Sequence, residues 1–144
     1  MKREFSAGGI VFKKATNSFE ILVSQHSQHH GWVFPKGFIG DKKAGESKEE
    51  TALREVQEET GIIGTIIEPL PPITYWYQMK GKKHKKTVYY YLMNYIGGNT
   101  ANHDWEMENV EWLPIEKVAE RLTFASDRKV WEEAKERILS IATE

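Results

Sequence analysis

Runs of apolar residues separated by polar turns predict a series of β-strands. Residues 5–12 and 19–24 form two such runs, joined by the polar turn Thr16-Asn17-Ser18. A short third run, residues 32–34, is stopped by Pro35. Further strands are expected in residues 62–77, which the Pro71-Pro72 pair interrupts, in residues 87–95, which are rich in β-branched and aromatic side chains, and in residues 110–113.

Helical signals fall between these strands. Residues 47–60 carry the clearest one, because Ser47 and Glu50 form a capping box and Gly61 suits the position after the last turn. Pro114 is expected to open a short helix, and residues 127–141 predict a last amphipathic helix. The segment 37–45 is predicted to be a loop, and the basic segment 81–86 a turn. This irregular interleaving predicts an α/β fold in which helices cover both faces of a mixed sheet.

The composition is typical of a globular protein. The chain has 144 residues, 40% of them hydrophobic and 28% charged, which suits one domain over residues 1–144. The formal net charge of −1 excludes a global field that attracts nucleic acid or acidic membranes, so any basic patch is local. The lack of cysteine excludes disulfides, thiolate metal sites and a cysteine nucleophile. The sequence has no signal-peptide core and no apolar stretch that could span a membrane, so we expect a cytoplasmic protein. The sequence does not determine the oligomeric state.

Three glutamates in the expected helix 47–60 carry the strongest chemical signal. Glu55, Glu58 and Glu59 are spaced i, i+3 and i+4, so they share one helix face and repel one another. Arg54 offsets part of this repulsion, and a divalent cation that prefers hard oxygen ligands, Mg²⁺ or Mn²⁺, would offset more. Taken alone, these glutamates favour a solvated acidic helix face, and the wider motif reverses that preference.

That motif resembles the signature of the Nudix hydrolase superfamily. It comprises nine specified positions at fixed spacing, which are Gly40, Glu46, Arg54, Glu55, Val56, Glu58, Glu59, Gly61 and Ile62. The resemblance implies the Nudix α/β/α sandwich with a mixed β-sheet between helices. One departure is visible, because the Pro35-Lys36-Gly37 turn lies three residues further upstream than in relatives. We therefore expect a three-residue insertion within residues 37–45.

The resemblance also implies roles for individual residues. Glu55, Glu58 and Glu59 are expected to be catalytic and to hold Mg²⁺ or Mn²⁺, with the backbone carbonyl of Lys36 as a further ligand. In some relatives the glutamate at the place of Glu55 helps to deprotonate water. Glu46 and Arg54 are expected to be structural, tying the loop to the helix through a charge-assisted hydrogen bond. Metal ions neutralise phosphate oxygens and activate water, which suits cleavage of a pyrophosphate linkage.

Five local features are present: His29-His30 before Trp32, the helix start Glu49-Glu50-Thr51-Ala52-Leu53-Arg54, the aromatic run Tyr75-Trp76-Tyr77, the strand entry Lys86-Thr87-Val88, and Glu106 six residues before Trp112. In these features the chain resembles the asymmetric diadenosine tetraphosphate hydrolases. This similarity implies an aromatic platform that stacks on a base, with Tyr75 and Tyr77 as candidates. It also implies phosphate-binding cations, for which the candidates are Lys36, His30, Lys83 and Lys86. Finally, it implies one more catalytic acid, for which the candidate is Glu106. Asp104 and Glu108 compete with Glu106 for its role. The aromatic residues also suit packing on the sheet, and the lysines also suit a solvated turn.

The leading hypothesis is an enzyme that cleaves dinucleoside polyphosphates, such as diadenosine tetraphosphate, by attack of water on phosphorus. Other possible substrates are a nucleoside triphosphate, a capped or triphosphorylated RNA 5′ end, or a diphosphoinositol polyphosphate. No membrane partner is expected, and nucleic acid is expected only as an RNA 5′ end. An alternative from another class is a non-catalytic Nudix-fold binding module, and the presence of all three glutamates counts against it.

Overall fold

The computed structural model describes residues 1–40 and 42–142. In chain order the strands are β1 (Lys2–Ala15), β2 (Ser18–His26), β3 (Trp32–Val33), β4 (Lys36–Phe38), β5 (Ile62–Pro69), β6 (Ile73–Met79), β7 (Lys82–Gly98) and β8 (Met107–Pro114). The α-helices are α1 (Lys48–Thr60), α2 (Val118–Arg121) and α3 (Ala125–Ala142), and short 3₁₀ helices span Thr100–Asn102 and Ile115–Lys117. Residue 41, which belongs to the predicted insertion, lies outside the described residues.

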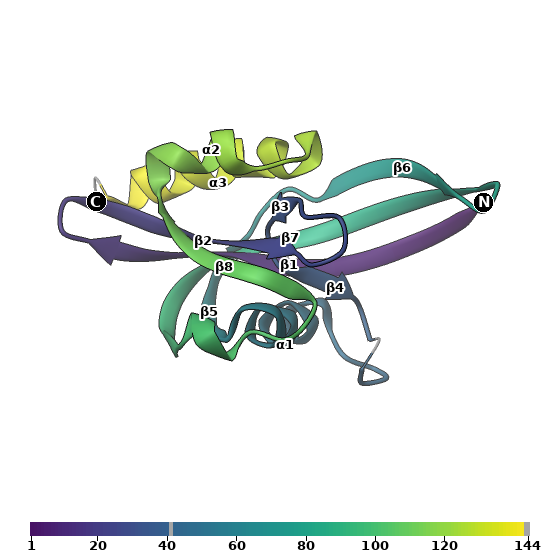
Figure 1. Ribbon diagram of the computed structural model, residues 1–144, viewed down its shortest axis with the longest axis horizontal. Coiled ribbons are helices and arrows are strands. Elements are labelled where there is room, and N and C mark those ends of the chain that lie inside the picture. The colour runs from purple at the N-terminus through teal and green to yellow at the C-terminus, as the bar shows by residue number, and fades with distance from the viewer. Residues whose placement is uncertain (41, 143–144) are drawn as a thin grey trace.

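The strands form one mixed sheet between two helical layers. Its main path runs β3-β2-β1-β7-β5, and β4, β6 and β8 pair with β1, β7 and β2 respectively. The central pair β1 and β7 is parallel, whereas the other pairs are antiparallel. Figure 1 shows α1 on one face of the sheet and α2 with α3 on the other. The predicted fold class, a mixed sheet with helices on both faces, is confirmed.

The core has two halves that follow this layering. One half packs α3 residues such as Trp131 and Ile138 against inward-facing strand residues such as Ile10 and Leu92. The other half packs Ala52 and Val56 of α1 against the opposite face of the same strands. No helix in the described part of the chain is long and apolar enough to cross a bilayer.

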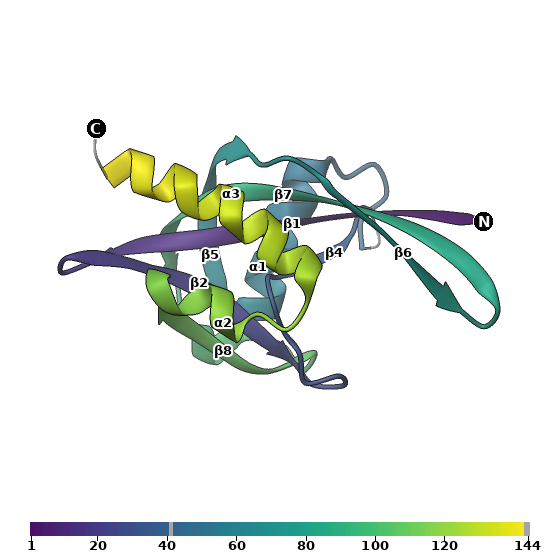
Figure 2. The ribbon, with the colours of Figure 1, turned by 90° about the horizontal axis from the view of Figure 1, so that it is seen from above.

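A split in the sheet positions the site. Strand β1 pairs with β2 at Phe12–Ala15 but with β4 at Ser6–Gly8, so β2 and β4 diverge along its edge. Helix α1 packs against both β1 and β4 beside this split, under the sheet in the view of Figure 2. The prediction of a loop over residues 37–45 is wrong at its start, because Gly37 and Phe38 pair with Ala7 and Ser6 in the β4 ladder.

The prediction of a basic turn over residues 81–86 is also wrong. The turn consists of Lys80 and Gly81 alone, and β7 starts at Lys82. Both turn residues have positive φ, 53° and 76°, as in the two-residue turns that match the twist of a hairpin. Cross-strand pairing from Met79 with Lys82 onward outweighs the weak strand preference of the lysines. Pro114 ends β8 instead of opening a helix, and the 3₁₀ turn begins one residue later.

Candidate active site

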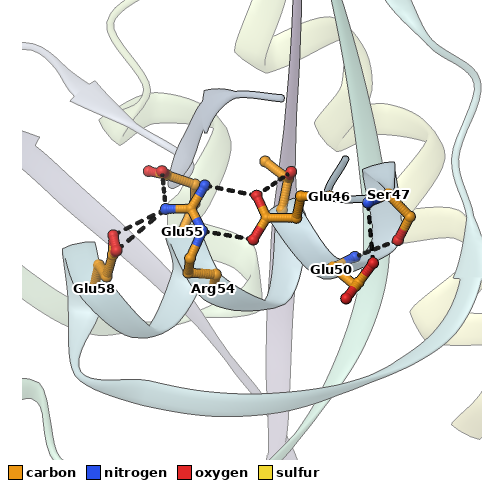
Figure 3. A network of polar contacts seen from close by, with 7 residues as sticks. Glu46, Ser47, Glu50, Arg54, Glu55 and Glu58 are labelled. Atoms are coloured by element: carbon orange, nitrogen blue, oxygen red, sulfur yellow. Dashed lines mark hydrogen bonds and ion pairs between the residues drawn. The ribbon is translucent and has the colours of Figure 1, made fainter. Parts of the chain in front are cut away.

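Helix α1 begins and ends where its local signals place it. The Ser47 hydroxyl accepts the Glu50 N–H at 3.1 Å, and the Glu50 carboxylate accepts the Ser47 N–H at 3.0 Å (Figure 3). At the other end Gly61 has a φ of 78°, a left-handed conformation that glycine adopts without steric strain. These two caps fix which turn of the helix carries Glu55, Glu58 and Glu59.

Arg54 forms a network of ion pairs with three glutamates. Its Nε and Nη2 donate to the two carboxylate oxygens of Glu46 at 2.8 and 2.9 Å, and Nη1 donates to Glu55 at 2.7 Å and to Glu58 at 2.9 Å (Figure 3). The Thr51 hydroxyl also donates to Glu46, at 2.7 Å. The hydrogen bonds from Arg54 and Thr51 lower the pKa of Glu46 to about 2. The predicted hydrogen bond between Glu46 and Arg54 is therefore present.

A cavity of about 770 Å³ opens beside this network, within the size range of small-molecule sites. Seven of the predicted site residues line it: Lys36, Glu55, Glu58, Glu59, Tyr75, Lys86 and Glu106. They come from β4, α1, β6, β7 and the segment before β8, so the fold brings together residues that are distant in sequence. Asp104, which competed with Glu106 in the sequence, also lines the cavity, whereas Glu108 pairs with His30.

Two of the carboxylates are buried against each other. Glu55 is 6% exposed and Glu59 is 4% exposed. Burial, followed by the adjacent charge of Glu55, raises the pKa of Glu59 well above its usual value, while the Lys36 ammonium opposes this shift. Buried like charges of this kind are unfavourable unless a cation or a proton neutralises them.

The donor chemistry of this group suits a divalent cation. Glu55, Glu58 and Glu59 supply hard carboxylate oxygens at one wall of the cavity, the ligand type that Mg²⁺ and Mn²⁺ prefer. In residues 1–40 and 42–142, no three such side chains yet converge on one point. Arg54 Nη1 pairs with both Glu55 and Glu58, the latter at i, i+4, and so holds these two carboxylates on the same side of the helix.

Two glycines permit close packing at the site: Gly37 faces the Glu55 carboxylate, and Gly8 faces the backbone of Pro35 and Lys36. A Cβ atom on Gly37 would lie 2.1 Å from the carboxyl carbon of Glu55, and one on Gly8 would lie 2.1 Å from the carbonyl oxygen of Pro35. Sequence reasoning did not single out Gly8 as a site residue, and it did not see that Gly37 faces Glu55. The available signal was a glycine within a strand pattern, which often marks a close backbone approach.

The lining of the cavity also includes apolar and aromatic side chains. Phe34, Ile73, Tyr75, Val88, Tyr90 and Phe124 line it. Burial, followed by the charge of Asp127, raises the pKa of Tyr75 to about 12. Asp127 itself is 5% exposed and accepts the Phe34 N–H and the Tyr90 hydroxyl, both at 3.4 Å. Sequence reasoning missed Asp127, because an acid in the first turn of a helix is usually read as favourable for the helix dipole.

A stacked pair of histidines lines another part of the wall. The rings of His26 and His29 are 4.3 Å apart and nearly parallel, and Phe124 meets His29 edge-on. Each histidine accepts a backbone N–H at Nδ1, His26 from Gln28 and His29 from Gly31. Burial is the main cause that lowers the pKa of His29. The cavity thus combines carboxylates, cations and flat rings, the groups that a nucleotide requires.

A family model, the NUDIX domain, matches residues 2–134 of the chain. The chain belongs to the Nudix family. Among its relatives, MutT4 of Mycobacterium tuberculosis is 43% identical over 141 residues, which cover 94% of this chain and 56% of MutT4. The Nudix chain thus spans about half the length of that relative.

Two further comparisons cover nearly the full length of both partners. The asymmetrical bis(5′-nucleosyl)-tetraphosphatase of Rattus norvegicus is 27% identical over 149 residues, 94% of this chain and 95% of the rat protein. Among solved structures, the NUDIX domain of Shewanella oneidensis NrtR in complex with ADP ribose superposes with a TM-score of 0.73 and 25% identity, covering 96% of this chain and 90% of that one.

Three of the predicted substrate-binding residues are not among the residues that line the Nudix cavity. The side chain of His30 is 65% exposed and pairs with Glu108. The Tyr77 hydroxyl donates to Glu4, and its ring stacks on His84 at 4.9 Å. The Lys83 ammonium lies over the ring of Trp76, 4.8 Å from its centre, on the other face of the sheet from Lys86.

Proposed function

We propose that this Nudix protein is a metal-dependent pyrophosphohydrolase that cleaves dinucleoside polyphosphates such as diadenosine tetraphosphate. One observation carries the proposal. A single cavity is lined by a buried carboxylate group, three lysines and several aromatic side chains, the complements of a metal ion, a phosphate chain and a base. The printed name of the rat relative, a bis(5′-nucleosyl)-tetraphosphatase, agrees with this substrate class.

Mg²⁺ or Mn²⁺ is the proposed cofactor. Glu55, Glu58 and Glu59 would hold it, together with the backbone carbonyl of Lys36. When bound, such an ion neutralises phosphate oxygens and lowers the pKa of a coordinated water. The burial of Glu55 and Glu59 beside each other supports this assignment, because burial, followed by the charge of Glu55, raises the pKa of Glu59, and a bound cation would offset both effects.

The remaining roles belong to side chains of the chain itself. Lys36 and Lys86 bind phosphate oxygens, and Tyr75 stacks on one base while the apolar wall excludes water from it. Burial, followed by the charge of Lys36, lowers the pKa of Lys86 to about 8. An anionic phosphate beside Lys86 would offset both effects and stabilise its charged form. Glu106 lies close enough to Glu59 to raise its pKa slightly and completes the acidic wall.

The test is product analysis in ¹⁸O-water with Mg²⁺. Diadenosine tetraphosphate should give ATP and AMP, with ¹⁸O in one product only, which identifies the attacked phosphorus. ATP, a triphosphorylated RNA and a diphosphoinositol phosphate are run in parallel. Faster cleavage of any of these would reassign the substrate, and no release from any of them with either metal would refute the hydrolase itself.

A further inference from the structure

A basic, aromatic face of the sheet lies outside the active site. It belongs to a three-stranded ribbon that we define by residues 2–5 of β1, 74–79 of β6 and 82–87 of β7, with the turn Lys80-Gly81. Figures 1 and 2 show this ribbon projecting from the body of the molecule, with its tip beyond the helices of both layers. It carries seven cationic residues and one acidic residue, although the whole chain has a formal net charge of −1. Positive charge is therefore concentrated on the ribbon.

The strand alternation divides the ribbon into two different faces. One face carries Tyr75, which lines the cavity, and continues into Tyr77, His84 and Glu4, which contact one another. The acidic residue of the ribbon is thus already paired on that side. The opposite face, which we call the Trp76 face, carries Arg3, Phe5, Thr74, Trp76, Gln78, Lys83, Lys85 and Thr87. None of these eight side chains is acidic.

The Trp76 face is ordered as rows that cross the three strands. Arg3, Lys85 and Trp76 form the middle row, since Arg3 is in register with Lys85 and Lys85 with Trp76. Phe5, Thr87 and Thr74 form the next row towards the body. A shallow hollow of about 50 Å³ lies among Arg3, Phe5, Lys85 and Thr87. Four residues of strand span about 13 Å, which leaves room for two or three nucleotides on the face.

Trp76 is the centre of this arrangement. The indole is 50% exposed, and the ammonium groups of Lys83 and Lys85 lie 4.8 and 5.5 Å from the centre of the ring. Phe5 is 47% exposed on the other side of the hollow. Exposed rings interleaved with cations on an open sheet face are the combination that binds unpaired bases and their phosphates.

We propose that the Trp76 face binds single-stranded nucleic acid. One base stacks on Trp76, and Arg3 and Lys85 contact the flanking phosphates. A duplex should bind more weakly, because its bases are already stacked within the helix and cannot stack on Trp76. An anionic membrane is the less favoured partner, because the turn Lys80-Gly81-Lys82 is hydrophilic and Met79, 53% exposed beside it, is a single apolar side chain at the ribbon tip. The proposal goes beyond hydrolysis and does not depend on it, because these residues lie outside the cavity.

The proposal is tested by fluorescence polarisation with labelled ten-nucleotide single-stranded RNA and DNA and a matched duplex, in EDTA to prevent cleavage. The single strands should bind at low salt and the duplex more weakly. Trp76→Ala should weaken binding about tenfold, as expected for one lost base stack, without changing the salt dependence. Arg3→Ala with Lys85→Ala should weaken binding and reduce the slope of log Kd against log salt by about 1.4.

Trp105 provides a matched control. It is 78% exposed but follows Asp104 and precedes Glu106, so it offers a ring without cations. Trp105→Ala should leave nucleic-acid binding unchanged, and circular dichroism reports whether each variant is folded. The proposal is overturned if the protein fails to bind single strands, if Trp105→Ala weakens binding as much as Trp76→Ala, or if the duplex or phosphatidylserine vesicles bind more tightly than the single strands.

Discussion

Helix α1 and the ribbon both contain a dense run of like charges, yet the two runs have different consequences. In α1 the spacing of Glu55, Glu58 and Glu59 places three carboxylates at one wall of a cavity. In the ribbon, alternation sends Lys86 into the cavity and Lys83 and Lys85 to the opposite face. Side chains that are close in sequence therefore share a face only when their spacing matches the repeat of the element, about 3.6 residues in a helix and 2 in a strand.

The strongest way to test the α1 side of this comparison is Glu59→Gln. The variant keeps the shape of the side chain but removes the buried charge, and turnover should fall at least about 100-fold. Because burial already disfavours that charge, the free energy of unfolding should stay equal or rise. Nucleotide release and urea unfolding measure the two effects. Near-normal turnover would disprove the metal assignment, and Glu132→Gln, on an exposed part of α3, serves as the control.

Glu46→Gln tests whether the network around Arg54 stabilises the fold. Loss of the charged hydrogen bonds should cost about 2 kcal/mol at pH 7. The pKa of Glu46 is lowered to about 2, so its stabilisation is present above pH 4.5 and lost as the pH falls towards 2. The stability difference between the wild type and the variant should therefore shrink over that window. Urea unfolding at several pH values measures it; a difference independent of pH would count against the ion-pair explanation.

Lys86 and Lys83 form a matched pair that tests the division of the ribbon into two faces. Lys86→Met should raise the KM for a nucleotide substrate about tenfold, as expected for a lost bond between a cation and a phosphate. Lys83→Met should change KM little, because Lys83 lies over Trp76 on the other face. Steady-state kinetics decide the matter, and equal effects of the two substitutions would show that the faces do not act separately.

Tyr75 and Tyr77 repeat this test on a single face, at different distances from the cavity. Tyr75→Ala should raise KM about fivefold through the loss of base stacking. Tyr77→Ala should leave KM nearly unchanged and lower the free energy of unfolding instead, because it removes the contacts with Glu4 and His84. Should Tyr77→Ala raise KM as much as Tyr75→Ala, the base would extend further along the ribbon than we propose.

The smallest expected effect concerns the turn of the hairpin. Lys80 has a φ of 53°, which disfavours most side chains but suits asparagine. Lys80→Asn should therefore increase the free energy of unfolding by about 0.5 kcal/mol. Lys82→Asn, one position inside β7, should have the opposite sign because asparagine is unfavourable in a strand. Thermal unfolding compares the two variants, and a shared sign would reject the turn assignment.

The same contrast explains which features could be predicted from the sequence. The capping box, Gly61 and the i, i+3, i+4 glutamates are local signals, so helix α1 and its acidic face were predicted correctly. The ribbon depends on pairing between β6, β7 and β1, which no local signal in residues 81–86 reveals. Asp127 lines the cavity and accepts the Phe34 N–H, and Gly8 packs against the Pro35 carbonyl; both partners lie far away in sequence, so no local signal reveals these contacts.

The parallel pairing of β1 with β7 has a consequence for how this protein is made. Along one edge of β1, residues 2–12 pair with residues 84–94, so this edge emerges from the ribosome long before its partner strand. At about 5–20 residues per second, the delay is roughly 4–16 s. During that time α1 can already form from local signals, whereas the apolar edge of β1 is left uncovered. Chaperone association with nascent chains should consequently peak before residue 94 leaves the exit tunnel.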